Sequence, residues 1–209
     1  GTISALIYTA IVGYAMSRQN LRERNTFYKI FIFTMFFSGG TVPYYLIISA
    51  LGLFDSFLVY IIPCLFSVYN MLVFSNFFRG IPEEIRESAV MDGASEFRIF
   101  TSIIMPLSTP VISTVALWIA VGHWNSFYDT MLYTSDNKLW TLQYYLMKVI
   151  KESSIPTNIG GLPSDILQNV SPETVSFAAI IISIIPILVV YPLIFKMLTK
   201  GVVVGSLKG

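Results

Sequence analysis

Long apolar segments, separated by short polar ones, constrain this chain more than any other feature. Apolar runs cover residues 28–50, 57–78, 107–121 and 174–198, and a shorter run covers residues 3–16. A helix needs about 20 mostly apolar residues to cross the hydrocarbon core of a bilayer. Charged residues make up only 12% of the chain, which is about half the share found in soluble domains. The sequence therefore predicts an all-α, polytopic helical membrane protein.

The first apolar run is too short to cross a membrane unaided. Residues 3–16 would form a helix of about 21 Å, whereas the hydrocarbon core is about 30 Å thick. We therefore expect residues 1–209 to form a single transmembrane domain of about five spanning helices. The first of these would be the tail of a helix, and we expect that an N-terminal helix or helices are missing from this chain.

Lysine and arginine are distributed unevenly between the two sides of the predicted membrane. Three of them, Lys138, Lys148 and Lys151, lie on one side, and ten lie on the other. An excess of Lys and Arg marks cytoplasmic loops. Residues 79–106 and the C-terminus are therefore predicted to be cytoplasmic, and residues 123–173 to form an external loop region. The ten cytoplasmic residues are Arg18, Arg22, Arg24, Lys29, Arg79, Arg86, Arg98, Lys196, Lys200 and Lys208.

A charged segment, residues 83–106, interrupts the apolar runs. Pro82 suits the first turn of a helix, and Gly93 is a natural helix stop, because Gly adopts the left-handed conformation at little cost. Ser95 is expected to cap a second helix, which Pro106 would end or kink. The segment thus predicts a helix, a sharp turn and another helix. We expect the second helix to carry four residues on one side: Phe97, Phe100, Thr101 and Ile104.

The same segment resembles the EAA signature of permease subunits of bacterial ABC importers. That signature reads E-A-A, three residues, G, nine residues, I-x-L-P. It is matched by Glu87-Ser88-Ala89, Gly93, Ile103 and Pro106, with Ser88 in place of an alanine and Met105 in place of a leucine. The resemblance implies the type I permease fold of ABC importers and a loop that acts as a coupling helix, docked on a cytoplasmic ATPase subunit.

The resemblance also implies which residues contact the ATPase. In the loop these are Glu83, Glu84, Glu87, Ser88, Ala89, Asp92, Gly93, Ile103 and Pro106, and in the C-terminal tail Gly205 and Lys208. Five acidic residues and three Arg lie between Arg79 and Arg98, so this stretch is net negative on a side where positive loops are the rule. A negatively charged helix of this kind suits a groove with basic residues, although a solvated acidic surface would have the same composition.

Two further groups of residues are candidates for a substrate pathway. Gly39, Gly40 and Pro43 would break a spanning helix, and broken helices often line transport routes. Aromatic, amide and carboxylate groups at Trp124, Asn125, Tyr128 and Asp129 form a mixture typical of sugar-binding sites, and Asn70 is polar within a span. Helix packing through small residues and an aromatic belt at the membrane interface are the alternatives for these groups.

Residues 120–146 and 34–47, together with the terminal GSLKG, resemble carbohydrate ABC importers of the maltose-permease-like family. They are most similar to the LplC-type branch, which imports complex oligosaccharides. This implies a subunit of the bacterial inner membrane that works with a second permease, two ATP-binding-cassette ATPase subunits and an extracytoplasmic sugar-binding protein. Residues 151–173 fit an external loop that could contact that binding protein. ATP and Mg would be bound by the ATPase partner, so this chain is expected to bind no cofactor.

The sequence lacks the motifs that other classes of function require. There is no glycine-rich nucleotide loop ending in Lys-Ser or Lys-Thr and no His, Cys and acid set at metal-ligand spacing. The net charge of +1 gives no indication of nucleic-acid binding. An ion-driven secondary transporter is one alternative, but it predicts buried acids within the spans, and none is found. A membrane-embedded enzyme with chemistry between His123 and Asp129 is another, but it lacks a nucleophile. We therefore expect a transport subunit rather than an enzyme.

Overall fold

The computed structural model describes residues 1–153 and 172–206, and this part of the chain is helical. The elements are α1 (Thr2–Ser17), α2 (Arg24–Phe36), α3 (Thr41–Ala50), η1 (Phe57–Tyr60), η2 (Ile62–Cys64), α4 (Val68–Arg79), α5 (Glu83–Met91), α6 (Glu96–Ile99), η3 (Phe100–Ile104), α7 (Met105–Leu107), α8 (Thr109–Trp124), α9 (Tyr128–Tyr133), η4 (Asn137–Leu139), α10 (Leu142–Ser153) and α12 (Pro172–Ser206). The all-α prediction is confirmed.

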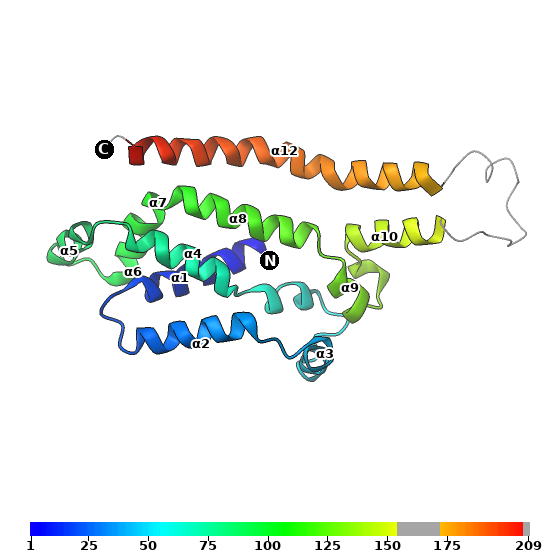
Figure 1. Cartoon of the computed structure of the whole chain (residues 1–209), viewed down its shortest axis with the longest axis horizontal. Helices are drawn as coiled ribbons and strands as arrows, with labels where there is room; N and C mark the ends of the chain where they lie inside the picture. Colours follow the sequence, from blue (N-terminus) through cyan, green and yellow to red (C-terminus); the bar gives the residue numbers. More distant parts are fainter. Residues whose placement is uncertain (154–171, 207–209) are drawn as a thin grey trace, which may run out of the picture.

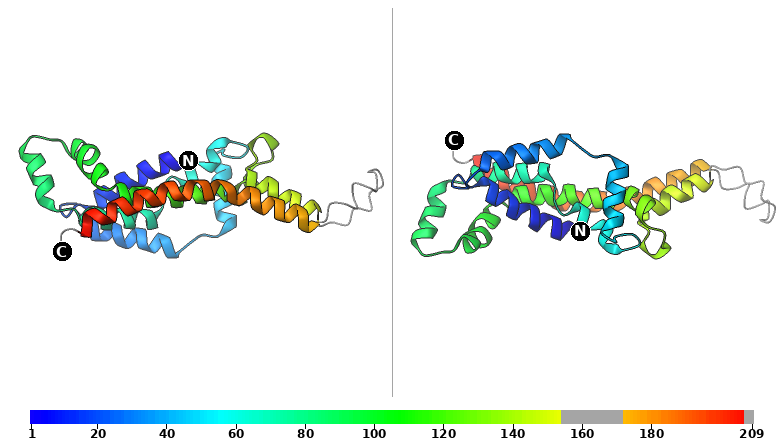
Figure 2. Two further views of the ribbon diagram at one scale, coloured as in Figure 1. Left: turned by 90° about the horizontal axis from the view of Figure 1, so that it is seen from above. Right: turned by 90° about the horizontal axis from the view of Figure 1, so that it is seen from below.

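The longer helices form an elongated bundle. Figure 1 shows α1, α2, α4, α8 and α12 running along its long axis, with α4 packed against α1 and α8, and α8 packed against α12. The α5 segment stands at one end, which it shares with the C-terminal end of α12 (Figures 1 and 2). The α3, α9 and α10 helices lie toward the other end. The structure therefore separates residues 79–106 from residues 123–153, as the predicted topology requires.

Three of the apolar spans are bent in the structure. Within the described ranges no unbroken helix meets a length and hydropathy test for crossing a membrane, whereas three bent helix pairs meet it jointly. The pairs are Arg24–Phe36 with Thr41–Ala50, bent by 111°, Phe57–Cys64 with Val68–Arg79, bent by 47°, and Glu96–Leu107 with Thr109–Trp124, bent by 84°. Thr2–Ser17 and Ser176–Pro192 are shorter apolar helices.

The largest bend lies at the glycine pair of the first broken span. Gly40 has φ +85°, a conformation that L side chains rarely adopt, and it precedes α3. The α2 helix has 13 residues, so it is about 20 Å long, and α3 turns away from its axis. The prediction of a break at Gly39 and Gly40 within the apolar run 28–50 is confirmed, and the two helices on either side of it meet the span test only together.

Two prolines lie inside α12 without ending it. They are Pro186 and Pro192, and although proline usually interrupts a helix, α12 continues through both. A proline leaves part of the helical backbone without its usual hydrogen bond, and in membranes a neighbouring helix often satisfies the freed groups. Here the indole N–H of Trp124 donates to the carbonyl of Ser183, one turn before Pro186, at 3.0 Å. This hydrogen bond joins α8 to the turn that the proline perturbs.

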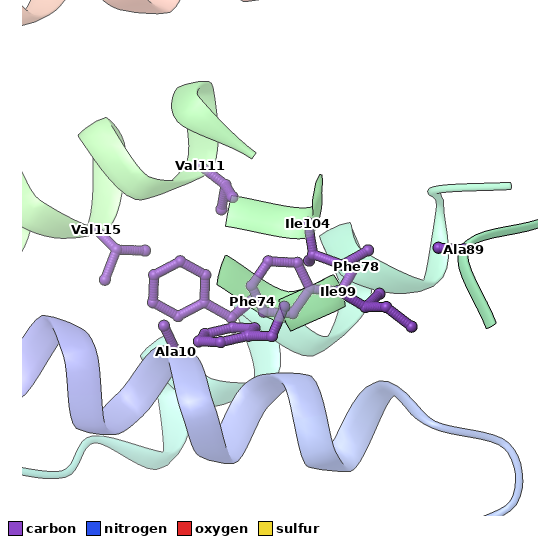
Figure 3. Packing of buried hydrophobic residues seen from close by; sticks show 9 residues of the cluster. Ala10, Phe74, Phe78, Ala89, Ile99, Ile104, Val111 and Val115 are labelled. Carbon is purple, nitrogen blue, oxygen red and sulfur yellow. The ribbon is translucent and has the colours of Figure 1, made fainter. Parts of the chain in front are cut away.

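One buried cluster joins the bundle to the segment at its end. It contains Ala10 of α1, Phe74 and Phe78 of α4, and Val111 and Val115 of α8, and Figure 3 shows these side chains converging between the helices. Its other members come from residues 83–106: Ala89, Ile99, Phe100 and Ile104. The end segment is therefore packed into the same cluster as the long helices.

The segment predicted as an external loop is partly helical. It contains α9, η4 and α10, whereas residues 154–171 lie outside the described residues. A second buried cluster links it to the turn after α3 through Ile48, Leu53, Val59 and Tyr133. This cluster orders the end of the bundle opposite α5.

Candidate functional sites

The α5 segment forms the first arm of an elbow, which we define as residues 83–107. Gly93 ends α5 with φ +79°. Its N–H donates to the Val90 carbonyl at 2.9 Å, and the N–H of Ala94 donates to the Ala89 carbonyl at 2.9 Å. This pair of bonds is the Schellman arrangement of helix ends. The hydroxyl of Ser95 then accepts the N–H of Arg98, so the predicted stop and cap are both confirmed.

The second helix of the elbow differs from its prediction. Residues 100–104 form a π-helical turn between α6 and α7, so the side chains do not follow regular α-helical spacing. Phe100 and Ile104 are buried, whereas Phe97 is 72% exposed and Thr101 is exposed, so these four residues do not share one side. The sharp bend falls at Ser108, two residues after Pro106 and before Pro110. The predicted kink is therefore present, displaced by one half-turn.

A network of charged side chains ties the elbow to the end of α1. The guanidinium of Arg18 donates two hydrogen bonds to Glu83, at 2.7 and 3.2 Å. Arg86 donates to Glu83 at 2.7 Å and to Glu96 at 2.6 Å, and the hydroxyl of Tyr14 donates to Glu96 at 2.6 Å. The hydrogen bonds from Arg18, with those from Arg86, hold the pKa of the Glu83 carboxyl below its usual value. Sequence reasoning missed this network, because its members are up to 82 residues apart.

The predicted coupling residues divide between two faces of the elbow. Glu84, Glu87, Ser88, Asp92 and Gly93 are exposed. Ala89 and Ile103 face the buried cluster instead, Glu83 is paired within the chain, and Pro106 is exposed beside the bend. Exposed apolar side chains flank the acids, notably Met91, which is 87% exposed, together with Phe97 and Val90. The free face of the elbow is thus acidic and apolar at once.

Of the two predicted C-terminal contacts, Gly205 belongs to α12, which ends at the same end of the bundle as the elbow. Lys208 lies outside the described residues.

At the opposite end, two separate sequence segments line one cavity. It has a volume of about 340 Å³, and its walls include Gly39, Gly40 and Pro43 from the break between α2 and α3, and Tyr128 and Asp129 from α9. Five predicted pathway residues therefore meet although about 85 residues separate them in the chain. Its remaining lining residues are Ser38, Thr41, Tyr44, Ile47 and Tyr133.

The chemistry of this cavity is aromatic and acidic. Tyr44 and Tyr128 offer ring faces and hydroxyls, while the buried Tyr133 lies in the wall. Asp129 accepts a hydrogen bond from the Ser126 hydroxyl at 2.9 Å, which leaves further acceptor capacity on its carboxylate. Such a set suits a polyhydroxylated ligand, because rings cover C–H surfaces while the hydroxyls and the carboxylate bond to hydroxyl groups.

The other predicted pathway residues lie elsewhere. Trp124 faces α12 and lines an apolar pocket with Pro186 and Ile187. Asn125 lines a different groove, which α10 and α12 border. Asn70 is buried in α4, with 9% of its surface exposed. The structure therefore does not bring these three together with Asp129.

Sequence reasoning also missed a clamp that orders this end. Asp55 has φ +50°, and its carboxylate accepts the backbone N–H groups of Ser135 at 2.5 Å and Asp136 at 2.9 Å. The Tyr60 hydroxyl lies 3.0 Å from the Thr130 hydroxyl and donates to the carbonyl of Leu139 at 3.0 Å. These bonds fix the loop after α3 against α9 and so support the cavity wall. Among the described residues no group of three or more His, Cys, Asp or Glu side chains could hold a metal ion.

Three comparisons relate this chain to known proteins. The family described as "Binding-protein-dependent transport system inner membrane component" matches residues 9–204. Protein LplC of Bacillus subtilis (strain 168) is 38% identical over all of this chain and 70% of its own length. The polygalacturonan/rhamnogalacturonan transport system permease protein YtcP of the same organism is 36% identical over all of this chain and 73% of its own length. A solved bacterial ABC transporter involved in the import of the acidic polysaccharide alginate is 31% identical and has a TM-score of 0.78, covering 93% of this chain and 70% of that chain.

Proposed function

Because this chain belongs to the family of binding-protein-dependent transport inner membrane components, we propose that it is the permease subunit through which an ABC importer moves an oligosaccharide. Membership in the family makes the chain a multi-pass transport component of the inner membrane rather than a catalytic subunit. The elbow would be its docking site for a cytoplasmic ATPase, and the cavity beside Asp129 would be part of the substrate route.

The observation that carries the coupling role is the packing of the elbow into the bundle. Ala89 and Ile99 belong to the same buried cluster as Phe78 of α4 and Val111 of α8. Packed clusters transmit displacements because they have few voids and resist deformation. A movement of α5 would therefore tilt α4 and α8 together, as rigid-body rocking requires. The exposed acids of α5 supply a surface for a groove with basic residues.

The proposed orientation of the subunit in the membrane follows from charge. Ten of the thirteen Lys and Arg residues lie on the side of the elbow and of the loop between α1 and α2, and an excess of Lys and Arg marks the cytoplasmic side. The cavity beside Asp129 would then face outward, where a sugar-binding protein delivers its ligand. A second permease subunit would complete the translocation route, and two ATPase subunits would bind the ATP and Mg that drive the cycle.

The substrate class rests on two supports. YtcP is by its name a polygalacturonan/rhamnogalacturonan transport permease, and the alginate importer carries a polysaccharide. The tyrosines and the carboxylate of the cavity suit a ligand rich in hydroxyl groups. An oligosaccharide fits both.

The decisive experiment measures ATP-driven sugar uptake in vesicles that contain the complete reconstituted transporter. Glu87→Lys places a positive charge on the exposed face of α5, and we expect it to reduce uptake at least tenfold and to weaken ATPase retention, because one reversed contact of a charge pair costs on the order of 2–5 kcal/mol. Glu152→Lys makes the same reversal at an exposed position at the other end of the bundle, and it should leave ATPase retention unchanged. Full coupling in the Glu87→Lys transporter would refute the docking assignment.

A further inference from the structure

A second polar pocket lies beside the elbow, where α2 begins and α4 ends. It has a volume of about 650 Å³ and is lined by residues that include Gln19, Glu23, Arg24, Asn25, Thr26 and Arg79. The proposed coupling and transport roles make no use of it. Its volume falls within the range of small-molecule binding pockets.

Two arginines in this pocket carry charges that the described residues do not neutralise. Neither Arg24 nor Arg79 forms an ion pair in the part of the chain that the structure describes. Their guanidinium carbons lie 5.5 and 5.8 Å from the ring centroid of Tyr28, so one aromatic ring positions both. The Nε of Arg24 is buried and has no hydrogen-bond partner among these residues, which is costly for a charged group.

The other polar groups around the pocket reduce the positive charge of the two arginines but do not neutralise it. The Nε of Arg79 donates to the Ser75 carbonyl at 3.3 Å, which leaves its terminal N–H groups available. The carboxylate of Glu23 also lines the pocket and accepts a hydrogen bond from the Thr26 hydroxyl at 3.3 Å. Two guanidinium groups face one carboxylate, and the positive end of α2 adds to the excess.

We propose that this pocket binds the phosphate of an anionic membrane lipid. A planar guanidinium matches phosphate geometry, and basic pockets between helices on the cytoplasmic side bind acidic headgroups. A lipid is favoured over a free phosphate because exposed apolar side chains continue from the pocket along α2, with Phe27 45% and Ile30 52% exposed, and would accompany an acyl chain. The position of the pocket at the cytoplasmic edge of the membrane rests on the proposed function.

The test titrates phosphatidylglycerol onto the complete, delipidated transporter and counts bound lipid by native mass spectrometry. We expect Arg24→Gln with Arg79→Gln to weaken phosphatidylglycerol binding at least 30-fold, because each guanidinium loses a charge-assisted contact to the phosphate, which contributes about a factor of ten. The control replaces two exposed basic residues that do not line the pocket, Arg22→Gln with Lys29→Gln, and should keep most of the affinity. Arg24→Lys with Arg79→Lys keeps the charge and should bind better than the glutamine pair, which separates charge loss from misfolding.

Three results would overturn the proposal. The first is an equal loss of lipid binding in the control variant. The second is that phosphatidylcholine, or inorganic phosphate alone, binds as tightly as phosphatidylglycerol. The third is that the Arg24→Gln, Arg79→Gln transporter loses a partner subunit but still binds the lipid. The last result would make the pocket a protein contact. Glu87→Lys should leave lipid binding unchanged, so failure of the docking role and failure of this proposal are distinguishable.

Discussion

Gly13 is a residue at which α1 and α4 approach each other closely. A Cβ added there would lie 2.7 Å from the Cβ of Phe74 and 3.3 Å from the carbonyl oxygen of Met71. Small residues permit such backbone approach between membrane helices. We did not single out Gly13 from the sequence, since one glycine in an apolar run carries no signal about its neighbours.

We expect Gly13→Ala to destabilise the protein by about 1–3 kcal/mol. The added methyl would clash with the Phe74 Cβ, which is fixed to the backbone of α4 and cannot rotate away. Gly122→Ala is the matched control, since an added Cβ there meets nothing within 4 Å. That change should be neutral or stabilising by up to about 1 kcal/mol. Thermal unfolding of both purified variants in detergent tests the pair, and equal midpoints would contradict the close approach.

Gly93 is needed for its backbone conformation and not for space. Its φ is +79°, and an added Cβ would meet nothing within 4 Å. We expect Gly93→Ala to cost about 1–2 kcal/mol at the end of α5, whereas Gly93→Asn should cost less because Asn tolerates the left-handed region. Hydrogen exchange of the α5 amides measures this local loss. If the alanine and asparagine variants exchange alike, the stop does not depend on the left-handed conformation.

At the scale of elements, the charged network decides how α5 is held against α1. Both Arg18 and Arg86 reach the carboxylate of Glu83, which is about half exposed, so we expect the pair with Arg18 to contribute less than about 1 kcal/mol and to weaken with salt. The charged network therefore orients the elbow, since the buried cluster already attaches the elbow to the bundle.

The pH dependence of this attachment follows from Glu83. Its pKa is lowered in the folded protein from an ordinary value of 4.5. The stabilisation is therefore complete above that value and is lost as pH falls through the lowered pKa. A spectroscopic distance between labels on α1 and α5 should stay constant from about pH 8 to about pH 5 and lengthen only in stronger acid. Arg18→Gln should move that change to higher pH, whereas Arg22→Gln, at an exposed position outside the network, should not.

The elements also show where local rules were overridden. Pro186 and Pro192 predict interruptions, yet α12 continues, and Trp124 donates to the turn before Pro186. We read Trp124 as a pathway residue or a member of an aromatic belt. Its hydrogen bond to another helix is a tertiary contact, which residue type alone does not reveal.

At the scale of the whole molecule, the elbow and the cavity lie at opposite ends of one bundle (Figure 1). Changes at the cavity should therefore affect substrate use without affecting ATPase docking. The charge at Asp129 is the feature to test, because it lines the cavity with three tyrosines.

We expect Asp129→Asn to raise the sugar concentration for half-maximal uptake about tenfold or more, since hydrogen bonds to a charged group contribute about 1.5–3 kcal/mol. Asp136→Asn is the control, because Asp136 is exposed, does not line the cavity, and caps η4 in a way that Asn preserves. Uptake is measured in reconstituted vesicles, and ATPase co-purification in the same samples. Unchanged uptake in the Asp129 variant would remove the cavity from the substrate route.

The sequence by itself determined the features that depend on residues close together in the chain. The apolar runs predicted a helical membrane protein, the EAA signature predicted the family, and Gly93 and Ser95 predicted the turn of the elbow, because a left-handed helix end and a side-chain cap need only their neighbours within a few residues. Only the tertiary structure decided which distant residues meet. Gly39 and Gly40 line one cavity with Asp129, Arg18 pairs with Glu83, and Gly13 packs against Phe74. These pairs form because the bent helices pack in one particular arrangement. The local sequence patterns of the segments do not encode that arrangement.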